Sequence, residues 1–261
     1  MKYLFFLGVS VFACSPALAQ PQDREITVLG SGGWQLVADS GQSISVMGAD
    51  ELDDLQSPDI TAALVRLPGV SFSRNGSAGG VTGVRVRGAG ADQVLVMIDG
   101  IRVADVAAPG GGYDFGALAA SGIGKIELLR GSNSVVWGSE AIGGVLALSS
   151  RRIDGVEVNA EYGSRGSFNG QMGAGLAGAG YAFTVNGGYS ETDGISSAAS
   201  GTEPDGFRQW RANGTSSVNL TEGLSAVFAG RYADSRVEFD GTSFSPPYGL
   251  IDTPEYSEIE E

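Results

Sequence analysis

Two neighbouring segments decide the fold of this chain: IELLRG at residues 126–131 and WGSEAIGGVL at residues 137–146. The first is an apolar run that ends in an Arg-Gly step and reads as a β-strand. The second carries Gly143-Gly144 ahead of the apolar run Val145 to Leu148, and it predicts another strand after a brief turn around residues 134–138. Both segments are therefore predicted to be strands of one small domain.

The segments just upstream are also strand-like. VRVRG at residues 84–88 alternates apolar and charged side chains, and VLVMI at residues 94–98 is apolar throughout. Asp99-Gly100 then gives a strong tight-turn signal before Ile101 to Val103. We therefore expect a β-hairpin with one buried arm.

Residues 57–67 read as an amphipathic helix. Ser57 would cap it and Pro58 would occupy its first position. The helical spacing then places four side chains on one apolar stripe, ahead of a stop at Pro68-Gly69: Ile60, Ala63, Leu64 and Leu67. With a strand expected at residues 43–47, residues 43–150 are predicted to form one small α+β domain.

The pattern changes after residue 151. Apolar and polar residues alternate over 156–163, 167–177, 180–190, 207–220 and 223–239. Such stretches are typical of barrel strands with one lipid face, and eight aromatic residues would supply interfacial girdles: Tyr162, Tyr181, Phe183, Tyr189, Phe207, Trp210, Phe228 and Tyr232. A soluble β-sandwich shows the same alternation, so the strands alone leave both architectures open.

Residues 1–19 read as an export signal. Lys2 precedes an apolar run from Tyr3 to Ala13, and Ala17-Leu18-Ala19 offers a small-residue cleavage site. The run is shorter than the roughly 20 residues that span a bilayer. Cys14 lies in a faint lipoprotein-like site, but we expect cleavage after Ala19, which leaves an exported chain without cysteine.

The composition argues against two classes of function, nucleic-acid binding and histidine-dependent catalysis. The net charge of −14, from 30 acidic and 16 basic residues, opposes a nucleic-acid partner. The sequence contains no histidine, which removes Ser-His-Asp, Cys-His and HExxH sites, and it shows no paired-carboxylate motif. We expect no enzyme activity, no catalytic residue and no required cofactor.

The ordered motifs at 84–88, 94–101, 126–131 and 137–146 resemble the plug domain of TonB-dependent outer-membrane receptors. The resemblance spans residues 25 to 261 and implies an α+β plug domain followed by the first antiparallel strands of an incomplete transmembrane β-barrel. It also implies a cell outer membrane location in a Gram-negative bacterium, with the N-terminus in the periplasm. The function it implies is energised uptake of a scarce large ligand, such as cobalamin or an iron-siderophore chelate.

A short segment in the tether at residues 20–42 resembles the TonB box of that family: Glu25, Ile26, Thr27, Val28, Leu29 and Gly30. The partner it implies is the TonB energy-transducing protein, which would bind the box by strand addition. An extended apolar segment on a Gly-rich tether suits this, since it offers unpaired backbone groups to a foreign sheet edge.

Three arginines of the predicted plug have two interpretations. Arg85, Arg87 and Arg130 could be exposed strand charges of little energetic weight. In the family, arginines of the Arg-Gly motifs pair with acids of the barrel wall and hold the plug in place. The resemblance therefore assigns this plug–barrel lock to Arg87 and Arg130.

Within the family, the residues after 190 are most similar to cobalamin transporters, in segments such as Thr192-Asp193-Gly194 and Pro204-Asp205-Gly206-Phe207. Members of that group collect loop aspartates around calcium, which prefers carboxylate oxygens. The resemblance makes Asp193 and Asp205 the candidate calcium ligands. Ordinary solvated turn acids are the competing interpretation.

The length leaves further alternatives. The 111 residues from 151 to 261 are fewer than the ~220 that about 22 barrel strands need, so we expect a fragment or a truncated barrel. The main alternative to an uptake receptor is a truncated, non-transporting plug remnant that acts at most as a binding module. A passive porin and an exported hydrolase are less favoured, because porins need no box or plug and hydrolases need the missing catalytic groups.

Overall fold

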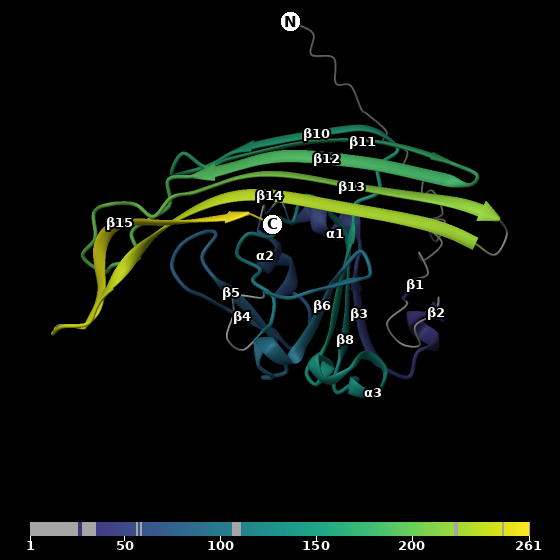
Figure 1. The fold of residues 1–261 in the computed structure, drawn as a ribbon, viewed down its shortest axis with the longest axis horizontal. Helices are drawn as coiled ribbons and strands as arrows, with labels where there is room; N and C mark the ends of the chain where they lie inside the picture. Colours follow the sequence, from purple (N-terminus) through teal and green to yellow (C-terminus); the bar gives the residue numbers. More distant parts are fainter. Residues whose placement is uncertain are drawn as a thin grey trace, which may run out of the picture.

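The structure is a computed structural model that describes residues 26–27, 35–55, 57, 59–105, 111–221, 224–246 and 248–260. It has two main parts (Figure 1). The N-terminal domain, from β3 to β9, holds a five-stranded and a two-stranded sheet. The curved sheet, β10 to β15, arches over one side of that domain.

The two deciding segments lie side by side at the centre of the five-stranded sheet, whose order is β3-β8-β9-β6-β7. The strands are β3 (Ser43–Met47), β6 (Val94–Ile98), β7 (Ile101–Val103), β8 (Ile123–Arg130) and β9 (Gly144–Ser150). β8 pairs antiparallel with β9, with Ile126 opposite Leu148, and β9 pairs parallel with β6. The two predicted strands are confirmed, and their side chains Ile126, Leu128, Leu146 and Leu148 are fully buried.

The predicted hairpin is confirmed as well. β6 is buried along its whole length, while β7 lies at the sheet edge. Asp99 and Gly100 both have positive φ, 51° and 82°, as the tight turn between twisted strands requires. The Asp99 carboxylate also accepts hydrogen bonds from the Ser150 N–H at 2.7 Å and its hydroxyl at 2.6 Å, which fixes the turn against the end of β9.

The helices are short, and among the described residues none is long and apolar enough to cross a membrane. The predicted helix forms as α2 (Ile60–Leu64), but its cap is Asp59 rather than Ser57. The Asp59 carboxylate accepts from the Thr61 N–H at 2.9 Å, and Arg74 fixes that carboxylate from the other side at 2.6 Å. The helix is therefore shorter than the predicted residues 57–67, and its capping residue also forms an ion pair that the sequence pattern did not reveal.

Several elements were not predicted. They are α1 (Ala49–Asp54), α3 (Ser134–Trp137), the strand β4 (Val70–Arg74), and the short elements β1 (Ile26–Thr27), β2 (Gln35–Leu36), η1 (Val37–Asp39), η2 (Ala91–Gln93) and η3 (Ser139–Ala141). β4 pairs with β5 (Thr82–Val86), so the predicted strand at residues 84–87 belongs to a separate two-stranded sheet. One buried cluster joins this pair to α2 and the five-stranded sheet.

The curved sheet confirms all five predicted stretches and adds a sixth strand. Its members are β10 (Gly155–Tyr162), β11 (Phe168–Gly178), β12 (Tyr181–Thr192), β13 (Phe207–Thr221), β14 (Leu224–Ser243) and β15 (Gly249–Glu260), each antiparallel to the next. β15 escaped prediction because Pro254 interrupts its pattern, and proline is tolerated there because the strand lies at the edge of the sheet.

The curved sheet has its apolar face outward. Val158, Leu176, Val185, Trp210 and Phe228 are exposed on the side away from the N-terminal domain. The side toward that domain carries buried polar residues: Asn169, Thr184, Ser190, Gln209 and Ser235. A soluble sandwich has the reverse arrangement, so the faces favour a wall that meets lipid. Phe207 corrects the predicted girdle, because its ring packs inward against Gly79.

We predict that Leu128→Ala destabilises the N-terminal domain by about 2–5 kcal/mol, because truncating a fully buried leucine leaves a cavity. Urea unfolding of residues 37–150 would measure it. Val135→Ala is the control: Val135 is fully exposed, and its truncation should change stability by less than about 0.5 kcal/mol. Equal losses in both variants would show that β8 is not the centre of the core.

Candidate functional site

The connections of the curved sheet differ at its two ends. β11 and β12 are joined by a tight turn, and only two residues separate β13 from β14. At the other end lie the longer connections 163–167, 193–206 and 244–248. Acidic residues collect at this end, which makes it the first candidate site.

Glu203, Asp205 and Asp240 form the carboxylate group of this site. One oxygen from each lies within 4.8 Å of the others, which is the only such acidic group of three or more among the described residues. Asp205 is completely buried. Its Oδ2 accepts the Ser197 N–H at 2.7 Å, and its Oδ1 has no hydrogen-bond partner in the described part of the chain.

The electrostatics of the group are those of crowded acids. Withdrawal from water, followed by the charge of Asp205, raises the pKa of the Glu203 carboxyl above its ordinary value. Glu203 Oε2 is also buried without a partner among the described residues. Three convergent carboxylates, two with unpartnered oxygens, fit a hard cation such as calcium.

The two predicted calcium ligands are therefore separated. Asp205 belongs to the carboxylate group, whereas Asp193 does not, and its carboxylate lies against Gly166 instead. Glu203 and Asp240 join the group without having been singled out as ligands. The spacing Glu203-Pro204-Asp205 was the available signal for Glu203, since it brings two acids together in one loop.

The connection at residues 193–206, called the acid-bearing loop from here on, touches the N-terminal domain. The Ser77 hydroxyl donates to the Asp205 carbonyl oxygen at 2.9 Å. Two residues later, Gly79 lies so close to Phe207 and Val237 that any side chain there would collide with them. The loop at residues 75–81 thus packs against both the acid-bearing loop and the curved sheet, which we also call the wall.

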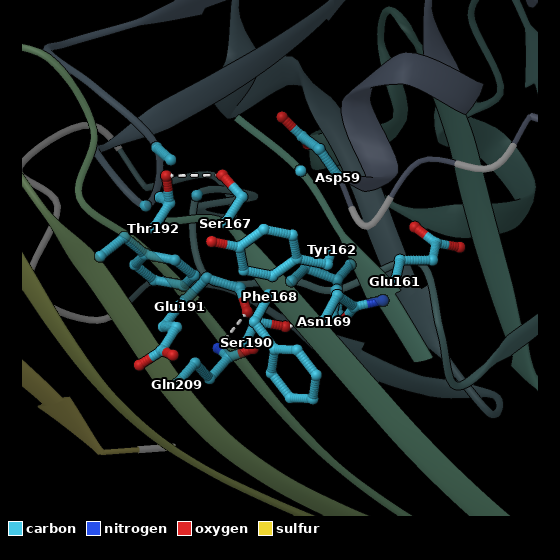
Figure 2. Close-up of a pocket in the computed structure, with 18 of the residues that line it drawn as sticks. Asp59, Glu161, Tyr162, Ser167, Phe168, Asn169, Ser190, Glu191, Thr192 and Gln209 are labelled. Atoms are coloured by element: carbon cyan, nitrogen blue, oxygen red, sulfur yellow. Dashed lines mark hydrogen bonds between the residues drawn. The ribbon is translucent and has the colours of Figure 1, made fainter. Parts of the chain in front are cut away.

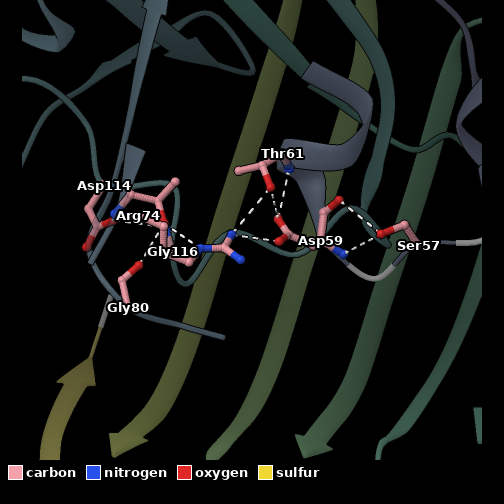
Figure 3. A network of polar contacts seen from close by, with 8 residues as sticks. Ser57, Asp59, Thr61, Arg74, Gly80, Asp114 and Gly116 are labelled. Carbon is pink, nitrogen blue, oxygen red and sulfur yellow. Dashed lines mark hydrogen bonds and ion pairs between the residues drawn. The ribbon is translucent and has the colours of Figure 1, made fainter. Parts of the chain in front are cut away.

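A polar network ties the same loop to helix α2 (Figure 3). Arg74 donates from Nε to Thr82 Oγ1 at 2.9 Å and pairs with Asp59 at 2.6 Å. The Thr82 hydroxyl donates to the Gly80 carbonyl at 2.7 Å, and Asp114 accepts the Thr82 N–H at 2.7 Å. Figure 3 shows these side chains converging between β4 and α2, so the loop and the helix cap share one set of contacts.

A cavity of about 410 Å³ lies between this network and the wall. Asp59 and Arg74 line it from the N-terminal domain. Tyr162, Phe168 and Gln209 line it from the wall, and Figure 2 shows the wall residues around the cavity with Ser190 hydrogen-bonded to Asn169. The cavity mixes aromatic rings with paired polar groups and holds no reactive constellation.

Strand β13 contacts the N-terminal domain through two polar side chains. Gln209 Nε2 donates to the Ala117 carbonyl at 2.6 Å and to Ser235 Oγ at 2.9 Å, and its side chain is almost completely buried. Arg211 donates to Ser121 Oγ at 2.9 Å. A signal for both was present in the sequence, because polar residues recur at every second position of this strand at Gln209, Arg211 and Asn213, although we did not single them out.

The predicted lock arginines lie elsewhere. Arg87 and Arg130 converge on Ser43: Arg87 donates to its hydroxyl at 3.2 Å and Arg130 to its carbonyl at 3.4 Å. Neither forms an ion pair with the described residues, and Arg85 is exposed on β5. Their pairing with acids of a barrel wall stays a prediction.

An unpredicted arginine bridges the two parts instead. Arg151 binds both carboxylate oxygens of Asp53 at 2.8 Å and donates to Glu157 of β10 at 2.8 Å. The hydrogen bond with Asp53 raises the pKa of Arg151, so the guanidinium stays charged. Arg151 thus fixes the segment between β9 and β10.

The predicted TonB box falls mostly outside the described residues, as do the export signal and its cleavage site. Glu25, Val28, Leu29 and Gly30 are not described. Ile26 and Thr27 form β1, which pairs antiparallel with Gln35 and Leu36 of β2. The described part of the box is therefore already extended.

Comparison with known proteins matches residues 37–145 to the family described as TonB-dependent Receptor Plug Domain. Among solved structures, the chain is similar to the ferric-catecholate import receptor of E. coli K12, with a TM-score of 0.61 and 19% identity over 80% of this chain and 29% of that one. The ferripyoverdine receptor of the outer membrane of Pseudomonas aeruginosa gives a TM-score of 0.66 at 13% identity, over 88% of this chain and 30% of that one.

The ferric yersiniabactin uptake receptor of Yersinia pestis gives a TM-score of 0.58 at 19% identity, over 76% of this chain and 32% of that one. The chain thus spans about a third or less of the length of these solved receptors. At these identities the likeness shows the fold, an α+β plug domain followed by the first antiparallel strands of a barrel.

We predict that Gln209→Ala speeds amide hydrogen exchange in residues 117–123 roughly tenfold or more. The substitution leaves the buried Ala117 carbonyl without its donor, at a cost of about 1–3 kcal/mol. Mass spectrometry of the exchanged protein in detergent would measure it. Arg208→Ala, on the exposed face of the same strand, should leave this segment unchanged, and equal exchange in both variants would remove β13 as the anchor.

Proposed function

Residues 37–145 form a plug domain of the TonB-dependent receptor family, and from this premise we propose that the chain serves in energised uptake of a scarce large ligand across an outer membrane. The observation that carries the proposal is the seating of this domain against the polar inner face of a sheet whose outer face is apolar. A plug on such a wall can block a pore and be moved by a partner. No covalent chemistry is needed for that task.

The proposed location is the outer membrane of a Gram-negative bacterium, with lipid against the apolar face of the curved sheet. The orientation rests on the connections of that sheet, since barrels of this kind have short periplasmic turns and longer outer loops. The acid-bearing loop then faces outward, and the N-terminus lies in the periplasm. In this orientation a ligand outside would meet the loops that touch residues 75–81.

An iron chelate is the ligand class that we favour. The similar solved structures are named as receptors for ferric catecholate, ferripyoverdine and ferric yersiniabactin. Cobalamin remains the alternative, supported by the acidic pattern of the loop at residues 193–206. Competition for uptake between labelled cobalamin and ferric siderophores would separate the two.

The competing function is a plug remnant that binds but does not transport. Its signature would be a folded N-terminal domain without insertion into the membrane. The exposed apolar face of the curved sheet favours insertion, because apolar surface of that extent is costly in water. Recovery of the protein in the soluble fraction of cells would favour the remnant.

We further propose that the TonB energy-transducing protein engages Glu25 to Gly30 by strand addition in the periplasm. The extended backbone of Ile26 and Thr27 supports this, since the same backbone groups that pair with β2 suit a foreign sheet edge. Arg87 and Arg130 are retained in this proposal as locking residues toward acids of the complete wall.

A calcium ion is proposed at Glu203, Asp205 and Asp240. The unpartnered oxygens of Glu203 and Asp205 support it, because a buried carboxylate oxygen without a donor is stabilised by a cation. Such an ion would fix the acid-bearing loop against residues 75–81 and so shape the outer surface.

We predict that Val28→Pro abolishes energised uptake while ligand binding at the cell surface survives. Proline removes the backbone N–H that strand addition needs and fixes φ. Uptake of labelled ligand by cells should fall to the level seen without the energy-transducing partner. Val28→Ala is the control, because it keeps the donor and loses at most ~1.5 kcal/mol of apolar burial. Normal uptake by the proline variant would show that the segment is only a tether.

We predict that Asp205→Asn weakens calcium binding roughly tenfold or more, because ligand charge sets the affinity of such sites. Asp193→Asn, a matched change in the same loop outside the carboxylate group, should leave the affinity unchanged. Titration calorimetry of the protein in detergent would decide. Equal affinities in the two variants, or a larger loss with Asp193→Asn, would contradict the assignment.

A further inference from the structure

Arg211 and Arg231 lie close together beside the contact between β13 and the N-terminal domain. Asn213 of β13 lies directly opposite Arg231 of β14 in the antiparallel register, and Arg211 lies two residues before Asn213 on the same face. Residues in this diagonal relation are within reach of long side chains. Both arginine side chains line the same small cavity, so two like charges lie close together in this part of the interface.

No carboxylate offsets these charges among the described residues. The three hydrogen bonds of Arg211 go to neutral oxygens: Ser121 Oγ at 2.9 Å, Ser190 Oγ at 2.6 Å and Asn169 Oδ1 at 2.9 Å. In the described part of the chain, neither Arg211 nor Arg231 takes part in an ion pair. Both arginine side chains are only partly exposed, and a cation that is partly withdrawn from water without a counter-charge is costly.

A small cavity lies where these groups converge. Its volume is about 20 Å³, and Arg211, Arg231, Asn213 and Ser121 all line it. Asn213 Nδ2 is buried and has no hydrogen-bond partner within the described residues. The lining therefore offers N–H donors and positive charge around a space that admits one particle the size of a water molecule or a monatomic ion.

We propose that this cavity binds a small monovalent inorganic anion, of which chloride is the type, between Arg211, Arg231 and the Asn213 amide. The anion would neutralise two facing cations and satisfy the unpartnered donor. Because Arg211 also holds Ser121, the bound anion would fasten the N-terminal domain to β13. The inference goes beyond uptake and does not depend on the ligand, on calcium or on the TonB partner.

The test compares the protein, purified in detergent, in sodium chloride and in sodium gluconate at equal ionic strength, so that general screening is the same. Gluconate is too large for the cavity. Chloride should slow hydrogen exchange of residues 117–123 about fivefold when its concentration is about four times its dissociation constant, since the factor is one plus that ratio. Bromide should act like chloride.

Three variants test whether the chloride effect on hydrogen exchange depends on Arg231. Arg231→Gln should abolish the difference between chloride and gluconate, while Arg231→Lys, which keeps the charge, should retain it even if the affinity is lower. Arg208→Gln removes one positive charge from the exposed face of β13 and should respond like the unaltered protein. Identical exchange in all salts would mean that the cavity holds water only, and a full chloride response in Arg231→Gln would place the anion elsewhere; either result overturns the proposal.

Discussion

The structure depends on one constraint: the curved sheet turns its polar side chains inward, and those groups need partners away from water. Gln209 and Arg211 find them in the backbone and side chains of residues 117–121. Ser190 and Asn169 bond each other and Arg211 along the same face. A buried polar group without a partner costs about 1–3 kcal/mol. The N-terminal domain therefore covers the polar face of the curved sheet and supplies hydrogen-bond partners to it.

The same constraint explains how the acid-bearing loop and the interior of the N-terminal domain are joined. Asp205 turns its carboxylate toward Glu203 and Asp240 while its carbonyl accepts from Ser77. From the loop of Ser77, contacts continue through Gly80, Thr82 and Arg74 to Asp59 at the start of α2. Hydrogen bonds and one ion pair thus connect the acid-bearing loop to a helix of the N-terminal domain. A continuous set of contacts is one requirement for coupling the loop to the plug. The other requirement is that these contacts have two alternative arrangements.

Local patterns predicted the elements whose neighbours are close in sequence or fixed by period. The apolar runs at 126–131 and 143–148, the Asp99-Gly100 turn and the alternating strands after residue 151 were all predicted, because burial and turn geometry act over a few residues. The cap at Asp59, the pairing of β4 with β5 and the edge strand β15 were not, since they depend on Arg74, on the sheet arrangement and on a tolerated proline. In the candidate site, Asp205 was predicted and Glu203 was missed, because the path of a long loop decides which acids meet. The residues of the curved sheet that contact the N-terminal domain could have been inferred from the sequence, because Gln209, Arg211 and Asn213 are polar at every second position of one strand.

We expect the curved sheet to meet lipid with its apolar face, while its polar face contacts the plug. Trp210 tests it directly, since it is exposed beside the buried Gln209, and it becomes the sole tryptophan when Trp34 and Trp137 are replaced by phenylalanine. Fluorescence of this variant would be measured in vesicles with brominated acyl chains and, separately, with aqueous iodide. If Trp210 faces lipid, the brominated lipid should quench its fluorescence strongly and iodide only weakly. Strong quenching by iodide with none from the brominated lipid would contradict it.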